Sequence, residues 1–406
     1  MNNLNFLVDV LKESPVFKTL EKNVKPGRTV CASGLSTINK SNIIYALCRL
    51  KGVTAFCLAS DEKEAQTLCN DLSCMGLRAY VYPVRDFNFL DFQSRSHEYE
   101  HARLKVLLKL LNHECDVAIA CVDAAAQLTV PRNVLEQSVI EFEEGRELSL
   151  EKATKALTLL GYERFDAVEG SGQFSLRGGI LDFFMPDSDY PVRCEFWGDE
   201  ITDLSYFDIE TQRRFKKADK ITLSPSTEIV IEDRAALADK IEHKAKLLRS
   251  KNSAKAKEKL FSEAELIRSG AMIANADKFI NQIYDKPESL FDYLDRNTLV
   301  FASEFTAIQE RGKSMDFISN ETLMQGFEDG TLCRGFDRFA LTFNECTEFL
   351  QSHGTIVLEN FVHGSMPIKL SEIISFSTKQ LSAWGGSYKQ LKEDVEGLFP
   401  PASRGV

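Results

Sequence analysis

A loop near the N-terminus carries residue types that could bind phosphate. Gly34, Lys40 and Ser41 follow the Walker A spacing G-x-x-x-x-G-K-[ST], after a predicted strand and before a predicted helix. Asn39 occupies the position of the second glycine, and a threonine and an isoleucine precede it. Asparagine tolerates left-handed backbone angles but these two residues do not, so the loop cannot easily turn its amides toward phosphates. In the alternative interpretation, Lys40 and Ser41 simply belong to the first turn of a helix.

A second stretch, at 161–215, combines charge with a strand pattern. Apolar and polar residues alternate over 173–184 and 191–207, and glycines separate the runs, which predicts antiparallel strands joined by tight turns. No nucleophile–base pair or metal cluster accompanies the charges, so this sheet is suited to docking a partner rather than to catalysis. A solvated sheet in an ordinary α+β domain is the alternative. The charged residues at expected outward positions are Arg164, Arg177, Arg193, Glu195, Asp199 and Glu200.

The predicted elements around the phosphate-type loop alternate between strands and helices. Short apolar runs predict the strands, and apolar residues at helical spacing predict the helices. Strands that alternate with helices imply a parallel sheet. We expect strands at 28–32, 53–58, 79–82 and 117–121, helices at 40–50, 61–74 and 97–113, and further strands at 298–304 and 355–360.

Between these two α/β stretches the pattern changes. A predicted helix at 149–160 leads into the alternating strands, and a lysine-rich helical segment follows at 235–268. This segment could contact DNA, but its interspersed acids favour a solvated helix face. The expected architecture is therefore an α/β unit interrupted by an antiparallel α+β insert.

The composition is that of a globular protein in a reducing compartment. Of 406 residues, 44% are hydrophobic and 27% are charged, and the formal net charge is −11. An acidic chain does not neutralise phosphates by default, so nucleic-acid contact would need a local patch. No apolar run reaches the length of a membrane helix, no secretion signal opens the chain, and the cysteines lack metal-ligand spacing. We expect a cytoplasmic protein with buried, reduced thiols, no metal site and no membrane contact.

Four motifs in the alternating stretch resemble one family. They are GY-x-R at 161–164, F-x-x-RGGILDFF at 174–184, EFWGDEI at 195–201 and FDIETQR at 207–213. These motifs are similar to the UvrB-homology module that the nucleotide-excision-repair protein UvrB shares with bacterial transcription-repair coupling factors, and the coupling factors are the nearer match. The resemblance extends weakly over the whole chain. It implies a degenerate helicase-like (P-loop type) parallel-sheet domain that a small antiparallel α+β insert domain interrupts.

The resemblance also implies boundaries and partners. Residues 1–122 and 213–385 would form the two halves of the helicase-like domain, and residues 123–212 would form the insert that recruits UvrA. Residues 386–406 would begin a following domain that is cut short. The contacts with RNA polymerase and DNA would lie in regions absent from this chain, and ATP and Mg²⁺ are expected only in the missing motor domains.

On the insert, the UvrA-binding positions of the family can be carried over by motif. Arg164 matches the arginine of GY-x-R, and Arg177 matches the last arginine before the glycine turn. Glu195 and Phe196 match an acidic–aromatic pair, and Arg193 is expected on the same charged face. UvrB has a further arginine two residues before Arg177, where this chain has a serine, so one positive contact is absent. Guanidinium groups suit such a surface because they pair bidentately with carboxylates.

The resemblance also bears on catalysis. The family has an Asp-Glu pair at the end of a strand in the second half, and here Ser303 and Glu304 stand at that place. UvrB-type loops have glycine at the position of Thr37. A neutral hydroxyl cannot replace a carboxylate as the charge-balancing ligand of Mg²⁺. The resemblance therefore implies a degenerate nucleotide site and no enzyme in this fragment, with weak nucleotide binding by Lys40 as the alternative.

The stretch 83–96 differs from UvrB as well. UvrB carries a tyrosine-rich hairpin that clamps DNA, and this stretch is too short to hold it. We expect Phe87, Phe89 and Phe92 to anchor a loop to the core, with stacking on bases as the alternative. Taken together, the residues predict the N-terminal, UvrA-recruiting region of a coupling factor. An active UvrB-type ATPase that verifies DNA damage and a free-standing UvrA adaptor are the two alternatives.

Overall fold

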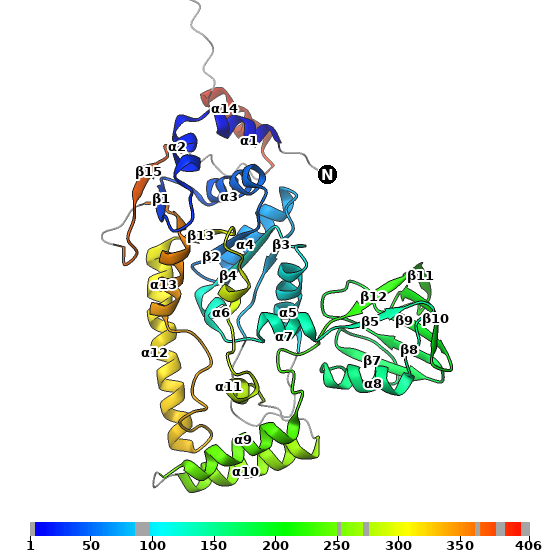
Figure 1. Ribbon diagram of the computed structural model, residues 1–406. Coiled ribbons are helices and arrows are strands. Elements are labelled where there is room, and N and C mark those ends of the chain that lie inside the picture. The colour runs from blue at the N-terminus through cyan, green and yellow to red at the C-terminus, as the bar shows by residue number, and fades with distance from the viewer. Residues whose placement is uncertain are drawn as a thin grey trace, which may run out of the picture.

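The computed structural model describes residues 5–85, 97–249, 253–270, 276–361, 366–378 and 386–398. Its largest element is a parallel sheet of seven strands in the order β15-β1-β14-β13-β2-β4-β3 (Figure 1). Strands from both halves of the chain contribute to this sheet, with β1 lying between β15 and β14, so neither half could form it alone. The strands are β1 (Val30–Ser33), β2 (Ala55–Ala59), β3 (Ala79–Val81), β4 (Val117–Cys121), β13 (Leu299–Ser303), β14 (Thr355–Leu358) and β15 (Glu372–Ser375).

Helices cover both faces of this sheet. We call the sheet and these helices the parallel-sheet unit. The central strands are apolar along their whole length because both of their faces are buried. On one face lie α1 (Asn5–Glu13), α2 (Pro15–Asn23), α3 (Thr37–Lys51) and α4 (Glu62–Cys74). On the other face lie α5 (Glu98–Leu111), α6 (Val122–Ala126), the first turns of α12 (Phe305–Asp329) and α13 (Phe343–His353).

The insert projects from one side of the parallel-sheet unit (Figure 1). It contains a six-stranded sheet in the order β11-β10-β9-β8-β7-β6, a two-stranded sheet of β12 and β5, and one helix, α8 (Leu150–Leu159). The six-stranded sheet is antiparallel except where β6 runs parallel to β7. The strands are β5 (Ile140–Glu143), β6 (Glu163–Arg164), β7 (Gln173–Arg177), β8 (Ile180–Phe183), β9 (Val192–Trp197), β10 (Glu200–Phe207), β11 (Arg214–Lys217) and β12 (Lys220–Leu223).

The insert has a hydrophobic core of its own between the six-stranded sheet and α8 with β5 and β12. The boundary that the sequence predicts at position 212 falls before β11 and β12, yet both strands pair with the insert. This boundary is therefore too early. The cause is that residues 214–217, which read RFKK, form an exposed edge strand with no alternation of apolar residues to reveal it.

The lysine-rich segment forms two helices, α9 (Arg234–Leu247) and α10 (Ser253–Ser269), which pack side by side at one end of the molecule (Figure 1). Acidic residues lie among its cations: Arg268 pairs with Asp239 and Glu242. The remaining elements are α7 (Arg132–Gln137), η1 (Ala276–Phe279), α11 (Ile280–Ile283), η2 (Leu290–Tyr293) and α14 (Tyr388–Leu398).

The predicted fold class is confirmed, since a parallel sheet carries a separate, largely antiparallel insert. The ten cysteines all lie within the described residues, form no disulfide, and are buried except for Cys74. In the described part of the chain, no helix combines the length and the apolarity that crossing a bilayer requires. The prediction for Phe87, Phe89 and Phe92 lies outside the described residues.

Candidate functional site

The phosphate-type loop is short because helix α3 begins early. The helix starts at Thr37, so the residues predicted to crown the loop form its first turn. The amides of Asn39 and Lys40 donate to the carbonyl of Ser36 at 3.0 and 3.1 Å. The amides of Gly34 and Leu35 donate to carbonyls of the chain after β14, at 3.2 and 3.0 Å. Four backbone donors that could hold a phosphate are thus already used within the protein.

Gly34 is a glycine for a reason unrelated to phosphate. Its φ is +79°, in the left-handed region that favours glycine, and a Cβ atom there would lie 2.1 Å from the carbonyl oxygen of Phe376. Phe376 directly follows β15, the strand that neighbours β1. The glycine therefore permits the close approach of the edge strand.

Lys40 is buried among carboxylates at the carboxyl end of the parallel strands. Its side chain is only 4% exposed, and its Nζ lies 2.5 Å from Glu304 Oε1, 3.5 Å from Glu64 Oε1 and 3.0 Å from Ser303 Oγ. Ser303 in turn donates to Glu64 at 2.5 Å. The side chain of Ser41 donates to Asp71 at 2.9 Å. The one cation that would meet a phosphate is neutralised by internal acids, which would repel an anion.

One further carboxyl group, that of Glu359, completes this cluster. Burial and the neighbouring Glu304 raise the pKa of Glu359 to about 7. For Glu304, burial acts in the same direction, but Lys40 outweighs it and holds the pKa of Glu304 below its usual range. Glu304 also adopts a left-handed backbone with φ +57°, and its Oε1 accepts from the amide of Asn360 at 2.9 Å. The charged groups of this cluster therefore contact one another and the backbone within the protein.

The second site is the outer face of the six-stranded sheet, the face that points away from α8 and from the insert core. Strand register places one row of polar residues across it, with Ser175 opposite Asp182 and Asp182 opposite Arg193. A neighbouring row places Arg177 opposite Ile180, and Ile180 opposite Glu195. Three of the five predicted partner-binding residues, Arg177, Arg193 and Glu195, therefore share this face.

Asp182 connects two of these residues, and its side chain is 1% exposed. It accepts two hydrogen bonds from Arg193, both at 2.8 Å, and one from Arg177 at 2.8 Å. The Arg193 guanidinium also lies 4.4 Å from the ring centroid of Phe207 and is 13% exposed, whereas Arg177 is 51% exposed. Arg193 is thus held within the sheet, while Arg177 presents its guanidinium to solvent.

Glu195 and Phe196 lie on opposite sides of β9. Glu195 pairs with Arg214 of β11, which also contacts Asp203 at 2.9 Å. Phe196 is buried in the insert core, so it supports the face from beneath. Trp197, which the sequence analysis did not select, is 82% exposed at the turn between β9 and β10. The sequence could have predicted this exposure, because the residue that directly follows a core-facing aromatic residue in a strand must point outward.

Arg164 is not on the outer face. It pairs with Phe174 in the parallel β6–β7 ladder, and Phe174 faces the insert core. Paired residues point to the same side of a sheet, so Arg164 lies on the side opposite Arg177, exposed at the open edge. The expectation that Arg164 and Arg177 share one charged face is wrong. The two-residue strand β6 and its parallel register leave no alternation from which the sequence could show this.

Comparison with known proteins finds similarity to one domain family and to one kind of repair protein. Residues 140–229 match the family model of the UvrB interaction domain. The chain is 26% identical over 399 residues to the transcription-repair-coupling factor of Bacillus subtilis, covering 95% of this chain and 34% of that protein. It is 25% identical over 337 residues to that of Staphylococcus epidermidis (78% and 27%), and 22% over 404 residues to that of Staphylococcus aureus (97% and 34%). The chain spans about a third of the length of the curated relatives it matches, and the predicted resemblance is confirmed.

Proposed function

We infer from the match over residues 140–229, and from the likeness to transcription-repair-coupling factors along the chain, that this protein contains the repair-recruiting module of such a factor. Its role would be to bind UvrA through the insert. In this way it would bring nucleotide excision repair to sites where RNA polymerase has stalled. The contacts with RNA polymerase and DNA would come from regions beyond this chain, and the protein would work in the cytoplasm, as its unpaired thiols suggest.

One observation gives the main support for the proposed docking role: the buried Asp182 fixes the position of Arg177 at the surface. Asp182 fixes one edge of the guanidinium, and half of the side chain stays exposed. A guanidinium whose rotamers are restricted in advance loses less entropy when it pairs with a carboxylate of a partner. Ile180 and Trp197 add apolar surface to the same side of the insert, as protein interfaces require.

We propose that the parallel-sheet unit performs no nucleotide chemistry. The backbone amides of its phosphate-type loop already donate hydrogen bonds to carbonyl groups of the protein, and Lys40 is paired with Glu304 and Glu64. Ser303 supplies no carboxylate for Mg²⁺. The unit would then act as a scaffold that holds the insert, and ATP-driven motion would belong to other parts of the full protein.

A titration of UvrA into the labelled chain tests the docking role. Replacement of Arg177 by alanine removes a charge-assisted contact at the interface, so we expect weakening by about 2 kcal/mol, roughly 30-fold in Kd. Arg146→Ala is the matched control, because Arg146 is a similarly exposed arginine of the insert that lies between β5 and α8. Equal UvrA affinity for the wild type and Arg177→Ala would exclude the proposed face.

A further inference from the structure

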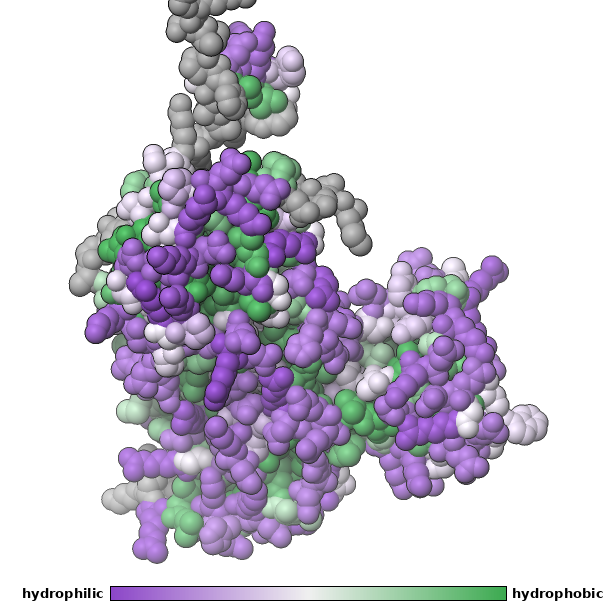
Figure 2. All heavy atoms as spheres, turned by 45° about the horizontal axis from the view of Figure 1, so that its top comes forward, coloured by the Kyte–Doolittle hydropathy of each residue, from purple (hydrophilic) through white to green (hydrophobic). Residues whose placement is uncertain are grey.

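Two segments connect the insert to the parallel-sheet unit, and both lie against helix α5. The incoming segment is 127–131 and the outgoing segment is 224–229. Figure 1 shows them entering and leaving the insert next to α5 and α7, and Figure 2 shows apolar side chains gathered between the insert and the rest of the molecule. A flexible tether would be exposed to solvent along its length. Most of the outgoing segment is buried instead.

On the insert side, the outgoing segment is bonded to the ends of α8 and β6. The amide of Ser226 donates to Leu160 O at 2.8 Å, and the hydroxyl of Tyr162 donates to Ser224 O at 2.7 Å. Gly161 allows the close approach, since a Cβ atom there would lie 2.5 Å from Thr227 Cγ2. The first half of the segment thus belongs to the insert.

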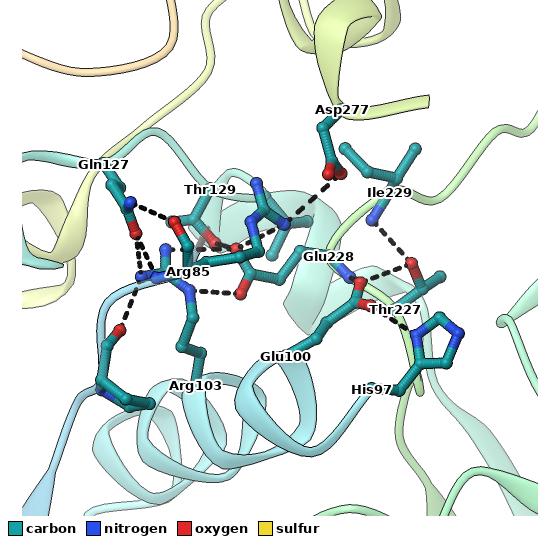
Figure 3. Close-up of polar contacts among 12 residues, drawn as sticks. Arg85, His97, Glu100, Arg103, Gln127, Thr129, Thr227, Glu228, Ile229 and Asp277 are labelled. Carbon is teal, nitrogen blue, oxygen red and sulfur yellow. Dashed lines mark hydrogen bonds and ion pairs between the residues drawn. The ribbon is translucent and has the colours of Figure 1, made fainter. Parts of the chain in front are cut away.

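On the other side, the same segment is bonded to α5 through buried charges (Figure 3). Arg103 and Glu228 are both 0% exposed, and they form a two-point contact at 2.6 and 3.3 Å. Arg103 also donates to Gln127 at 2.8 Å, and Thr129 donates to Glu228 at 2.7 Å. Arg103 and Glu228 therefore join the incoming segment, the outgoing segment and α5 in one network.

Glu100 extends the network by one helical turn. It accepts from the Thr227 hydroxyl at 2.8 Å and from the Glu228 amide at 2.7 Å. Burial alone would raise the pKa of Glu100, but His97, Arg85 and this amide hold it at about 2. The carboxylate is therefore ionised at physiological pH, so it can accept these hydrogen bonds without a proton of its own.

Two direct contacts between the insert and α5 support the same arrangement. A Cβ atom on Gly172, which precedes β7, would lie 2.6 Å from His101 of α5 and 2.5 Å from the Ser226 hydroxyl. Lys105 of α5 pairs with Asp189 of the insert at 3.1 Å. The insert thus touches α5 through its own residues as well as through its connectors.

We propose that the Arg103–Glu228 network locks the insert to α5, so that the insert and the parallel-sheet unit move as one rigid body. The docking face is then presented in one fixed direction instead of on a swinging arm. A buried ion pair that is satisfied on all sides is well suited to this role, because any alternative orientation leaves an unpaired charge in the interior. This proposal does not depend on which partner the outer face binds.

Distance measurements between two spin labels test the lock in the chain without any partner. Cys74, the exposed cysteine of α4, carries one label, and Lys155→Cys on the exposed side of α8 carries the other. We expect one narrow distance distribution. Arg103→Met should broaden or split it, while Lys109→Met, which removes only a pair between α5 and Glu114 outside the insert, should leave it unchanged.

The fold of each variant is checked by its thermal transition. Should Arg103→Met fail to fold, Glu228→Gln supplies a second arm, because it keeps the size of the side chain and removes the charge that pairs with Arg103. That variant should also broaden or split the distance distribution. A broad distribution in the wild type, or an unchanged one in a folded Arg103→Met or Glu228→Gln variant, would overturn the proposal.

Discussion

Asp182 binds two arginines that differ in exposure, so Arg193 supports the sheet while only Arg177 presents its guanidinium to solvent. Arg193 donates two hydrogen bonds to it from a largely buried position, whereas Arg177 donates one and remains half exposed. The sequence could predict that charges gather on this stretch, because it alternates. It could not rank them, because the ranking depends on which strand lies beside which.

Removal of the two arginines should therefore destabilise the insert to different degrees. Arg193→Ala leaves the buried Asp182 short of its main partner and should destabilise the insert by about 3 kcal/mol. Arg177→Ala removes an exposed contact and should cost at most about 1 kcal/mol. Thermal or urea unfolding of the two variants measures this. Equal losses of stability would mean that Arg177 is as structural as Arg193.

The carboxyl cluster around Lys40 predicts a pH effect on stability. Because the pKa of Glu359 is about 7 in the folded protein and ordinarily 4.5, its contribution is fully present below pH 4.5 and is lost as the pH rises through 7. Glu359→Gln keeps the neutral form at every pH. Its melting midpoint should exceed that of the wild type at pH 8 and approach it near pH 4.5. Glu348→Gln, at an exposed position of α13, is the control, and the same pH response in both variants would argue against this assignment.

The same cluster predicts the absence of ATP hydrolysis. With Lys40 held by Glu304 and Glu64, its charge is not available to the γ-phosphate, and Mg²⁺ has no carboxylate at position 303. Phosphate release should equal that of a Lys40→Ala control, with and without DNA. Turnover that depends on Lys40 and nears the usual enzymatic rate of about 10 s⁻¹ would contradict this prediction.

At the scale of elements, the sequence predicts most strands and helices of the parallel-sheet unit, because buried strands are uniform apolar runs. It places the start of α3 at Lys40 instead of Thr37, although Ser36 is a residue type that favours the cap position. It also misses β11 and β15, since the exposed residues of edge strands carry little pattern. These edges matter locally: the chain after β15 requires a glycine at position 34, and β11 supplies Arg214 to the outer face.

A comparison of Gly34 with Gly52 tests whether the chain after β15 constrains the phosphate-type loop. Both have positive φ, but a Cβ atom at Gly52 meets nothing within 4 Å, whereas at Gly34 it meets the chain after β15. Gly52→Ala should cost about 1 kcal/mol from its backbone alone. Gly34→Ala should cost about 3 kcal/mol or more, because overpacking adds to the strain. Equal effects in denaturant unfolding would mean that β15 does not press on this loop.

For the whole molecule, the resemblance predicts an α/β unit interrupted by an insert, and the structure has that architecture. What could not be predicted is how the two are joined. Arg103, Gln127 and Glu228 come together only after α5 and both connecting segments are placed, and no spacing in the sequence brings them together. Helix α5 carries other charged residues such as Glu98 and Lys109, so its sequence does not mark Arg103 as the buried charge.

The central claim is that UvrA binds the outer face of the insert. Photo-crosslinking residues placed one at a time at positions 177, 180 and 197 sample that face, and residues at 152 and 155 sample the exposed side of α8. Upon irradiation with UvrA, we expect covalent adducts from the first three positions and none from α8. Adducts from 152 or 155, with none from 177, 180 or 197, would contradict the account.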